Sequence, residues 1–407
     1  MNPYSSLLVI ALIVLTACSP ANSSTTVITE DPEPVATLTV ALTPGINTPA
    51  ITNSTLRPPD FGPNIILYRG NAQRTGLYDE PAIRQLPEIQ WQSKVSSIWL
   101  MPPLVADDIL YTGGGDGSLY ALDIQTGEEI WSASGFGQME STGAIAGDLI
   151  VSGGYSKQVQ ALDRRNGEVV WTFNTSHVVQ ASPLIVEGRV FIATDHATFA
   201  LDLQTGELIW ETATGEENAF MGAPAIEDNV IYTTGGKVLL ALDSETGDEL
   251  WRVENESQFT ALALANGLIY VGNFDQFFRA YDQATGEERW KFEGSGLFWS
   301  APSIAGDIVY AGNDDQIYAL DARTGELLWS YKTDGIAVSE PVIVDDVIYV
   351  SDSSHELPRG PRHLYALDSS TGNDLWVFET ISTFLPAPAV RDGTIYVTTR
   401  GEVFALR

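Results

Sequence analysis

The stretch LDIQTGEEIW at residues 122–131 recurs along this chain, and its recurrence decides the fold. Successive aspartates of the phrase D-x-x-x-G-x-x-x-W lie 40, 39, 41, 39, 39 and 47 residues apart. The further copies are LDRRNGEVVW at 162–171, LDLQTGELIW at 201–210, LDSETGDELW at 242–251, YDQATGEERW at 281–290, LDARTGELLW at 320–329 and LDSSTGNDLW at 367–376. A fixed period near 40 residues, with several short β-type runs in each period, is typical of the blades of a β-propeller.

Each position that the copies of the phrase share has a physical role. The aspartate can accept hydrogen bonds from the amides of the following turn, and the glycine tolerates the positive φ that a tight reversal requires. The tryptophan begins an outer strand, and its ring is large enough to fill the wedge between two adjacent blades. We therefore expect structural docking by Trp91, Trp131, Trp171, Trp210, Trp251, Trp290, Trp329 and Trp376.

The strand count predicts eight blades closed end to end. The first hairpin and the third strand each occur eight times, but the outer strand with its phrase occurs seven times. Trp91, within EIQWQSKV (88–95) and 40 residues before Trp131, supplies the missing outer strand. We expect an all-β fold, an eight-bladed β-propeller of four-stranded antiparallel blades, in which the Trp91 strand pairs with the C-terminal blade and closes the ring. A seven-bladed ring with a stray strand is the alternative.

The N-terminal residues have the pattern of an export signal. Leu7–Leu15 is an apolar run too short to span a bilayer, and residues 2–6 contain no Lys or Arg. Leu15-Thr16-Ala17-Cys18 then resembles the bacterial lipobox, in which the cysteine is lipidated. We expect a signal peptide at 1–17, a lipidated Cys18 with a Ser/Thr/Pro-rich tether at 18–60, and the propeller at 61–407. A plain signal peptide with an incidental cysteine is the alternative.

The composition limits the classes of partner. With 53 acidic and 21 basic residues the formal net charge is −32, which repels phosphate backbones and anionic lipid head groups. We therefore expect no nucleic-acid partner and contact with a membrane only through the lipid anchor. Cys18 is the only cysteine, so no intramolecular disulfide can form and packing must stabilise the head, which we expect to be monomeric.

The phrase [YF]-A-L-D-x-x-T-G-x-x-x-W resembles the PQQ-type propeller repeat over residues 86–407. Together with eight blades, the lipobox and a length near 400 residues, it resembles the BamB-type outer-membrane assembly lipoproteins. YRGNAQRTG at 68–76 resembles the lead-in that precedes the first blade in such proteins, and we interpret it as packing. The resemblance specifies the fold more closely than the function, because the repeat hosts both enzymes and binding scaffolds.

The residues that the enzymes of this family use are missing here. The resemblance to quinoprotein dehydrogenases would require a calcium-bound quinone stacked on a disulfide of adjacent cysteines, and the chain has no Cys-Cys pair. The four histidines have no ligand spacing typical of a metal site, and no G-x-S-x-G or phosphate-binding glycine loop occurs. We expect no catalytic, cofactor-binding or metal-binding residue, and no enzyme. A quinoprotein dehydrogenase and a glycan- or small-ligand-binding propeller stay as alternatives.

The inter-blade loops contain the candidate partner-binding residues. An apolar circle is predicted around one mouth of the axial channel, from Trp99, Met139, Val179, Phe220, Phe259, Phe298, Ala337 and Phe384, with Met221, Trp299 and Leu385 beside them. If exposed, such a circle is a protein-docking surface, and the alternative is that the rings pack under their own loops.

The 47-residue step places an insertion, SDSSHELPRGPRH (351–363), on the same face. It brings His355, Arg359, Arg362 and His363 into a chain poor in positive charge. These side chains could pair with an acidic group on a partner, or the insertion could be one that the surface simply tolerates. The combined hypothesis is a lipid-anchored scaffold of the cell envelope that binds protein partners through one propeller face. In a host with an outer membrane, the predicted role is outer-membrane protein assembly, and Ser19 is compatible with that location.

Overall fold

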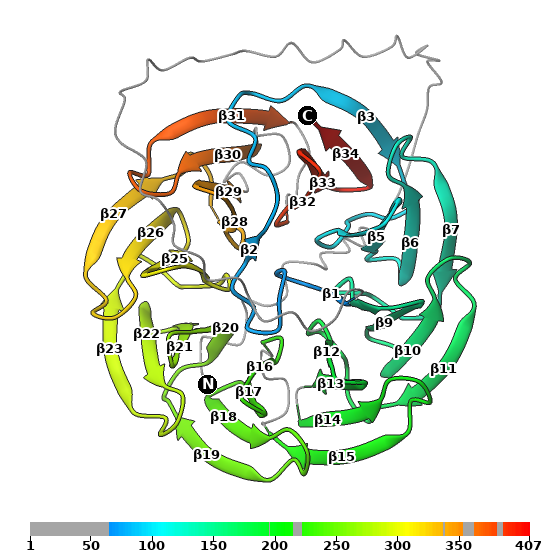
Figure 1. Cartoon of the computed structure of the whole chain (residues 1–407), viewed down its shortest axis with the longest axis horizontal. Coiled ribbons are helices and arrows are strands. Elements are labelled where there is room, and N and C mark those ends of the chain that lie inside the picture. Colours follow the sequence, from blue (N-terminus) through cyan, green and yellow to red (C-terminus); the bar gives the residue numbers. More distant parts are fainter. Residues whose placement is uncertain (1–64, 195, 215–221, 337, 353–361, 381–385) are drawn as a thin grey trace, which may run out of the picture. The chain divides into compact units, whose positions relative to one another are not determined.

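The computed structural model describes residues 65–194, 196–214, 222–336, 338–352, 362–380 and 386–407. Over these residues the chain forms eight antiparallel sheets arranged as a ring around a central axis (Figure 1). Each sheet contains one four-stranded blade, and two of the sheets gain a fifth strand from residues near the N-terminus. The predicted all-β, eight-bladed propeller is confirmed.

The strands of the first four blades follow the chain from the axis outward. Blades 1 and 2 consist of β4 (Leu104–Ala106), β5 (Ile109–Gly113), β6 (Ser118–Asp123), β7 (Glu129–Ser134), and β8 (Ala144–Ala146), β9 (Leu149–Gly153), β10 (Gln158–Asp163), β11 (Val169–Asn174). Blades 3 and 4 consist of β12 (Leu184–Val186), β13 (Arg189–Ala193), β14 (Ala197–Asp202), β15 (Leu208–Ala213), and β16 (Ala225–Glu227), β17 (Val230–Gly235), β18 (Val238–Asp243), β19 (Glu249–Glu254).

The remaining blades repeat this order until the ring closes. Blades 5 and 6 consist of β20 (Phe259–Ala265), β21 (Leu268–Asn273), β22 (Phe277–Asp282), β23 (Glu288–Glu293), and β24 (Ser303–Ala305), β25 (Ile308–Gly312), β26 (Gln316–Asp321), β27 (Leu327–Lys332). Blades 7 and 8 consist of β28 (Val342–Val344), β29 (Val347–Ser351), β30 (Arg362–Asp368), β31 (Asp374–Thr380), and β32 (Ala389–Arg391), β33 (Thr394–Thr398), β34 (Glu402–Leu406), β3 (Ile89–Lys94).

The meander gives the ring two unlike faces. Because neighbouring strands are antiparallel, the first and third connections of each blade emerge on one face. We call this the turn face, since it carries the D-x-x-x-G turns. The second connections and the inter-blade loops emerge on the other face, which we call the loop face.

The ring closes between the two ends of the propeller sequence. β3 pairs antiparallel with β34, with Trp91 opposite Ala405 and Gln92 opposite Phe404. Glu88 and Arg407 exchange two backbone hydrogen bonds of 2.8 and 2.9 Å. In Figure 1 the blue β3 lies along the outer edge of the dark red β34. The N-terminal strand therefore completes blade 8, as the sequence predicts.

Each outer tryptophan interlocks with the next blade. Its indole N–H donates a hydrogen bond of 2.8–3.1 Å to a backbone carbonyl of that blade, and in seven junctions the acceptor is the residue directly after the turn aspartate. The ring also lies under the turn glycine: a Cβ on Gly206 would be 2.5 Å from Cε3 of Trp171. The glycine is therefore required for its positive φ and for the close approach of the indole.

The turn aspartate holds the glycine in position. In blade 3, Oδ1 of Asp202 accepts hydrogen bonds from the backbone N–H groups of Gln204 and Thr205, at 2.9 and 2.8 Å, and from the Thr205 hydroxyl at 3.0 Å. The Gly206 N–H donates to the Asp202 carbonyl at 2.9 Å. The hydrogen bond from the Thr205 N–H lowers the pKa of Asp202, because it stabilises the charged carboxylate.

The contact between glycine and tryptophan can be tested with two glycines of blade 3. Gly206 has φ +71° and faces Trp171, whereas Gly188 has φ +76° and no atom within 4 Å of an added Cβ. We expect Gly188→Ala to cost about 1 kcal/mol of unfolding free energy, from backbone strain alone. Gly206→Ala should cost about 2 kcal/mol more, because the indole must move. Urea denaturation measures both, and equal losses would show that the contact adds nothing to the φ requirement.

The turn aspartates predict an acid limit to stability. Hydrogen bonds from the backbone N–H of the turn threonine lower the pKa of Asp123, Asp202 and Asp243 in the folded state. Their contribution is therefore complete above the unfolded pKa of about 3.9 and is lost as the pH falls below it. We expect the urea midpoint to be level from pH 7 to 5 and to fall below about pH 4. Asp202→Asn, which keeps an acceptor oxygen without the charge, should make that fall less steep.

Candidate functional site

The axis of the propeller is occupied by residues 65–78 of the chain itself, which we call the plug (Figure 1). β1 (Ile65–Leu67) pairs antiparallel with β8 of blade 2, and β2 (Leu77–Tyr78) pairs parallel with β28 of blade 7. Between them, carbonyls of the plug accept backbone hydrogen bonds of 2.8–3.0 Å from the inner strands of blades 4 to 7. The donor and acceptor pairs are Ile226 and Ala72, Leu264 and Gln73, Ile304 and Thr75, and Ile343 and Gly76.

Two buried arginines of the plug bind the inner ends of the blades. Arg74 has no exposed surface and donates to the carbonyls of Tyr68, Ser182, Pro183 and Pro224 at 2.6–3.3 Å. Burial lowers the pKa of this guanidinium to about 9, so it stays protonated at neutral pH.

Arg69 makes the corresponding contacts on the other side of the axis. It is 4% exposed and donates to the carbonyls of Ala301 and Pro302, to the Ser303 hydroxyl at 2.8 Å, and to the Arg74 carbonyl at 3.0 Å. Together the two side chains connect blades 3, 4 and 6 to the plug.

Prolines explain why cationic donors suit this position. Most inner strands are preceded by a proline, as at Pro183, Pro224, Pro302, Pro341 and Pro388. A proline has no N–H, so the ladder hydrogen bonds stop before it and nearby carbonyls at the axis need another donor. The arginine side chains supply N–H groups without adding acceptors of their own. The plug therefore satisfies backbone groups that the blades leave open.

Burial also keeps the tyrosines of the plug neutral. Burial is the main reason that the pKa of Tyr78 is raised to about 12 and that the pKa of Tyr68 is raised well above its usual value. Glu340 forms a hydrogen bond with the Tyr68 hydroxyl, and its charge adds to the rise in the pKa of Tyr68. Neither phenol can act as an acid or base near neutral pH.

The residues that lead from the plug to β3 replace a turn that blade 8 lacks. Trp376 of blade 7 donates its indole N–H to the Ile83 carbonyl at 2.9 Å, where the other blades offer a D-x-x-x-G turn. The Tyr349 hydroxyl donates to the same carbonyl at 3.2 Å and accepts from the Ile83 N–H at 2.6 Å. The segment at 68–76 and its continuation are thus structural, which agrees with the packing role interpreted from the sequence.

The apolar circle predicted from the inter-blade loops is not an exposed surface where the structure describes it. Met139, Val179, Phe259 and Phe298 have no exposed surface and pack beneath their own loops. Trp99 is half-buried against Gly115, and Trp299 is 39% exposed. The other predicted members, Phe220, Met221, Ala337, Phe384 and Leu385, lie outside the described residues. Of the described candidates, only Trp99 and Trp299 can offer their rings to a partner.

The described end of the insertion is built into blade 7. Arg362 is fully buried, so the expectation that it offers a surface charge is wrong, and His355 and Arg359 lie outside the described residues. His363 contacts the buried Asp352. The Asp352 carboxylate accepts hydrogen bonds from the backbone N–H of His363 at 2.9 Å and from the Tyr365 hydroxyl at 2.7 Å. A hydrogen bond with Asp352 raises the pKa of His363.

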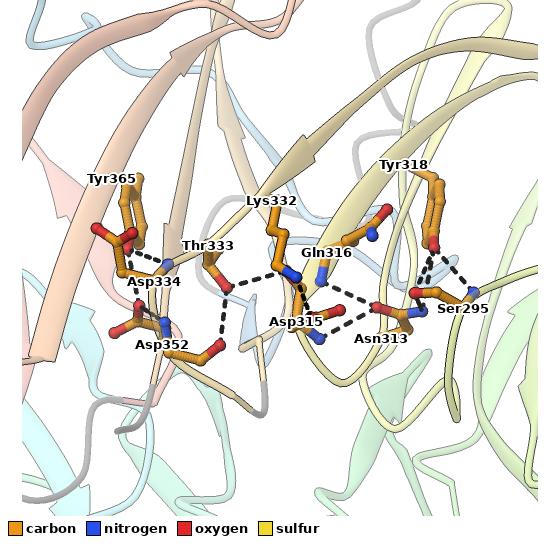
Figure 2. A network of polar contacts seen from close by, with 11 residues as sticks. Ser295, Asn313, Asp315, Gln316, Tyr318, Lys332, Thr333, Asp334, Asp352 and Tyr365 are labelled. Atoms are coloured by element: carbon orange, nitrogen blue, oxygen red, sulfur yellow. Dashed lines mark hydrogen bonds and ion pairs between the residues drawn. The ribbon is translucent and has the colours of Figure 1, made fainter. Parts of the chain in front are cut away.

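Blade 6 contains a neutral version of the same arrangement (Figure 2). Asn313 takes the position of Asp352: its Oδ1 accepts from the Gln316 N–H at 2.9 Å, and its Nδ2 lies 3.3 Å from the Tyr318 hydroxyl. Both networks tie the second connection of a blade to its third strand. The equivalence indicates that Asp352 and His363 form a structural cap, which explains their proximity without catalysis.

The space beside the plug is too small for a quinone, and the described residues form no metal-binding cluster. One cavity between the plug and blades 1, 7 and 8, lined by Arg69, Tyr78, Pro103 and Pro388 among others, measures about 10 Å³, which is space for one water molecule. Over the described part of the chain no three His, Cys, Asp or Glu side chains are placed to hold a metal ion. The stacked rings of His177 and His196, 3.8 Å apart, are parallel and cannot both point a nitrogen at one ion.

The role of Arg74 leads to a stability prediction. Arg74→Met keeps an unbranched apolar stem but removes the donors from carbonyls of blades 3 and 4, and each buried unsatisfied carbonyl costs about 1–3 kcal/mol. We expect a loss of about 3 kcal/mol or more in unfolding free energy, measured by urea denaturation. The matched control is Arg323→Met on an exposed turn, which should change stability by less than about 0.5 kcal/mol. Equal effects of the two substitutions would contradict the structural role of the plug.

Comparisons with known proteins agree with this architecture. A comparison with curated proteins gave no match. The structure of BamB from Moraxella catarrhalis matches with a TM-score of 0.63 at 20% identity, covering 79% of this chain and 100% of that one. Quinohemoprotein alcohol dehydrogenase from Comamonas testosteroni matches with a TM-score of 0.71 at 15% identity, covering 84% and 80%. A europium-containing methanol dehydrogenase matches with 0.69 at 12% identity, covering 84% and 97%.

These structural likenesses show the fold alone, since scaffold and dehydrogenase share it. The family model is more specific than they are. The model described as outer membrane protein assembly factor BamB matches residues 84–292 and 275–407, which together span every blade of the propeller. This chain belongs to the BamB family of PQQ-type β-propellers.

Proposed function

We propose that this protein is a non-catalytic scaffold of the cell envelope that binds protein partners on the loop face. The observation that carries the proposal is the plug, which fills the axis with Arg69, Arg74 and their backbone partners. Ligand pockets of enzymes usually measure about 300–1,000 Å³, far more than the space beside the plug. Membership in a family described as an outer membrane protein assembly factor supports partners among outer-membrane assembly proteins.

A quinoprotein dehydrogenase is the second candidate, because quinohemoprotein alcohol dehydrogenases share the fold. The residues available to bind a quinone argue against the dehydrogenase. The chain has one cysteine, at position 18, so the disulfide of adjacent cysteines that the resemblance requires cannot form. Among the described acidic residues only Asp352 is fully buried, and its carboxylate is engaged by His363 and Tyr365 in the cap of blade 7.

The loop face is the better docking face for a physical reason. Every D-x-x-x-G turn on the turn face forms part of the interlock between blades, so a partner there would have to avoid moving it. The loop face carries the exposed side chains Ile98, Tyr155 and Trp299, which are 50%, 40% and 39% exposed. Exposed apolar side chains of this size are typical of contact surfaces when they are held rigidly.

Anchoring and location are also part of the proposal. Cys18 lies outside the described residues, and none of the described segments forms an apolar helix with the length needed to span a bilayer. The lipobox-like sequence supports a diacylated Cys18, with a monomeric head held in the envelope on the 18–60 tether. In a host with an outer membrane this places the head in the periplasm.

Site-specific photo-crosslinking in native membranes tests the scaffold. A photoreactive residue in place of Ile98 or Tyr155 on the loop face should crosslink to a defined protein, whereas one in place of Leu208 on the outer rim should not. All three side chains are about 40–50% exposed, so the comparison is matched for accessibility. Absence of protein crosslinks from every loop-face position would contradict the scaffold.

Cofactor addition tests the alternative. We expect the purified full-length chain to show no stoichiometric absorbance change when titrated with pyrroloquinoline quinone and calcium, and no dye reduction with primary alcohols. A saturable 1:1 chromophore would favour the dehydrogenase, since the plug would then have to move to admit the ring system.

A further inference from the structure

An exposed tryptophan on the loop face is fixed at both ends of its ring system. Trp299, in the loop between blades 5 and 6, packs against Phe274 in a tilted arrangement, with ring centroids 4.6 Å apart at 49°. Its indole N–H donates to Oδ1 of Asp314 at 2.6 Å. Oδ2 of Asp314 accepts from the Leu297 N–H at 3.2 Å, so the carboxylate is fixed as well. We call Phe274, Leu297, Trp299 and Asp314 the Trp299 platform.

The geometry of the platform differs from that of the interlocking tryptophans. Those indoles donate to backbone carbonyls and lie under glycines of the next blade, whereas Trp299 is 39% exposed and donates to a carboxylate. Holding an aromatic ring rigidly at the surface removes most of the entropy cost of using it as a contact. A preorganised indole with an accessible face is the side chain that most often dominates the energy of a protein interface.

The loops around the platform are acidic, whereas the adjoining strands carry Arg279, Lys291 and Lys332. The loops at 255–258, 273–277, 294–300, 313–316 and 333–341 contain no Lys, Arg or His. They contain six carboxylates, namely Glu256, Asp275, Asp314, Asp315, Asp334 and Glu340. Backbone hydrogen bonds join some of these loops, from the Phe274 N–H to the Gln258 carbonyl at 3.0 Å and from the Val338 N–H to the Asn313 carbonyl at 3.4 Å.

Half of these carboxylates contact a cation or the plug. Asp275 pairs with Arg279 at 2.6 Å, and Asp315 pairs with Lys332 at 3.1 Å (Figure 2). Glu340 forms its hydrogen bond with Tyr68 of the plug. Among the residues that the structure describes, Glu256, Asp314 and Asp334 have no cation within ion-pairing distance.

Some carboxylates of the turn face, in contrast, are neutralised by arginines. There Asp148 pairs with Arg165, Asp282 with Arg289 at 2.6 Å, and Asp346 with Arg84. The platform thus combines a rigid exposed indole with uncompensated negative charge. An arginine side chain matches both, because its guanidinium stacks on an indole and donates to a carboxylate at the same time.

We propose that the Trp299 platform binds an arginine-bearing segment of the protein partner, with the guanidinium stacked on the Trp299 ring and hydrogen-bonded to Asp314. The proposal rests on the scaffold function and names the chemistry of its partner. Glu256 and Asp334 provide a longer-range field that attracts a basic segment, and this part weakens as salt screens it. Lysine binds more weakly, since an ammonium has no plane to stack on the ring.

Peptide titration of the full-length chain tests this chemistry. The probe is an extended peptide of alternating Arg and Ser, compared with Lys/Ser and Glu/Ser versions of the same length, followed by isothermal titration calorimetry at 150 mM salt. We expect the Arg/Ser peptide to bind with the highest affinity, the Lys/Ser peptide to bind more weakly, and the Glu/Ser peptide to show no detectable binding. Trp299→Ala and Asp314→Asn should each weaken Arg/Ser binding roughly tenfold, and Trp299→Phe, which keeps a ring but loses the N–H, should weaken it less.

A matched control is essential because a chain of net charge −32 attracts any polycation. Asp148→Asn removes one carboxylate from the turn face and should leave the affinity for Arg/Ser unchanged. Equal weakening by Asp148→Asn and Asp314→Asn would show that only the net charge acts, which would overturn the platform. Unchanged binding in Trp299→Ala, with a thermal midpoint equal to that of the unsubstituted chain, would overturn it as well.

Photo-crosslinking separates failure of the platform from failure of the scaffold. A photoreactive residue at position 277, beside the platform, is compared with one at 155 across the ring and one at 208 on the rim. Crosslinks to a protein from 277 that vanish with Asp314→Asn support both proposals. Protein crosslinks from 155 alone would overturn the platform and leave the scaffold standing, and crosslinks from none of the three positions would overturn the scaffold.

Discussion

The structure depends on one repeated contact between neighbouring blades. An indole of one blade lies under the turn glycine of the next blade and donates its N–H to the carbonyl of the residue after the turn aspartate. The contact joins two blades, so its effect spreads around the ring. No disulfide or described helix holds the blades together. The glycine is fixed by an aspartate that accepts three hydrogen bonds from its own turn, as at Asp202, and the close approach leaves no room for a Cβ. The repeated phrase thus records an interaction between neighbouring blades as well as a turn.

A ring built this way has one junction that its own repeat cannot complete. The chain must enter and leave somewhere, and in blade 8 the turn between β34 and β3 is replaced by two separate ends. Trp376 still needs an acceptor, and the Ile83 carbonyl supplies it. The residues just before Ile83 form the plug, whose arginines satisfy carbonyls near the proline-led inner strands. Ring closure and filling of the axis are therefore achieved by one continuous segment, which couples the state of the N-terminal lead-in to the whole propeller.

The sequence predicts the parts of this fold that repeat. The period, the hairpins and the displaced outer strand at Trp91 can all be predicted from the spacing of the repeated phrase, because every copy forms the same turn and the same contact with the next blade. The plug could not be derived in the same way, since YRGNAQRTG occurs once and its partners are backbone carbonyls, which sequence does not distinguish. Two features of the sequence could have indicated the plug. Prolines precede most inner strands, and Arg69 and Arg74 lie close together in a chain that is otherwise acidic. The described part of the apolar circle is buried for a related reason: alignment of the inter-blade loops places Phe259 and Phe298 at equivalent positions, but whether a loop covers them depends on loop conformation.

The two faces of the propeller are under different physical constraints, and this determines where function can reside. A change in a D-x-x-x-G turn alters a residue that holds two blades, so its cost appears in the stability of the whole ring. A change on the loop face alters only a connection within one blade or between two. Blade 7 illustrates the difference: its second connection carries the insertion, yet Asp352 and His363 keep the cap that Asn313 and Gln316 form in blade 6. Because the loop face tolerates such changes, an exposed and rigid Trp299 there costs the fold little.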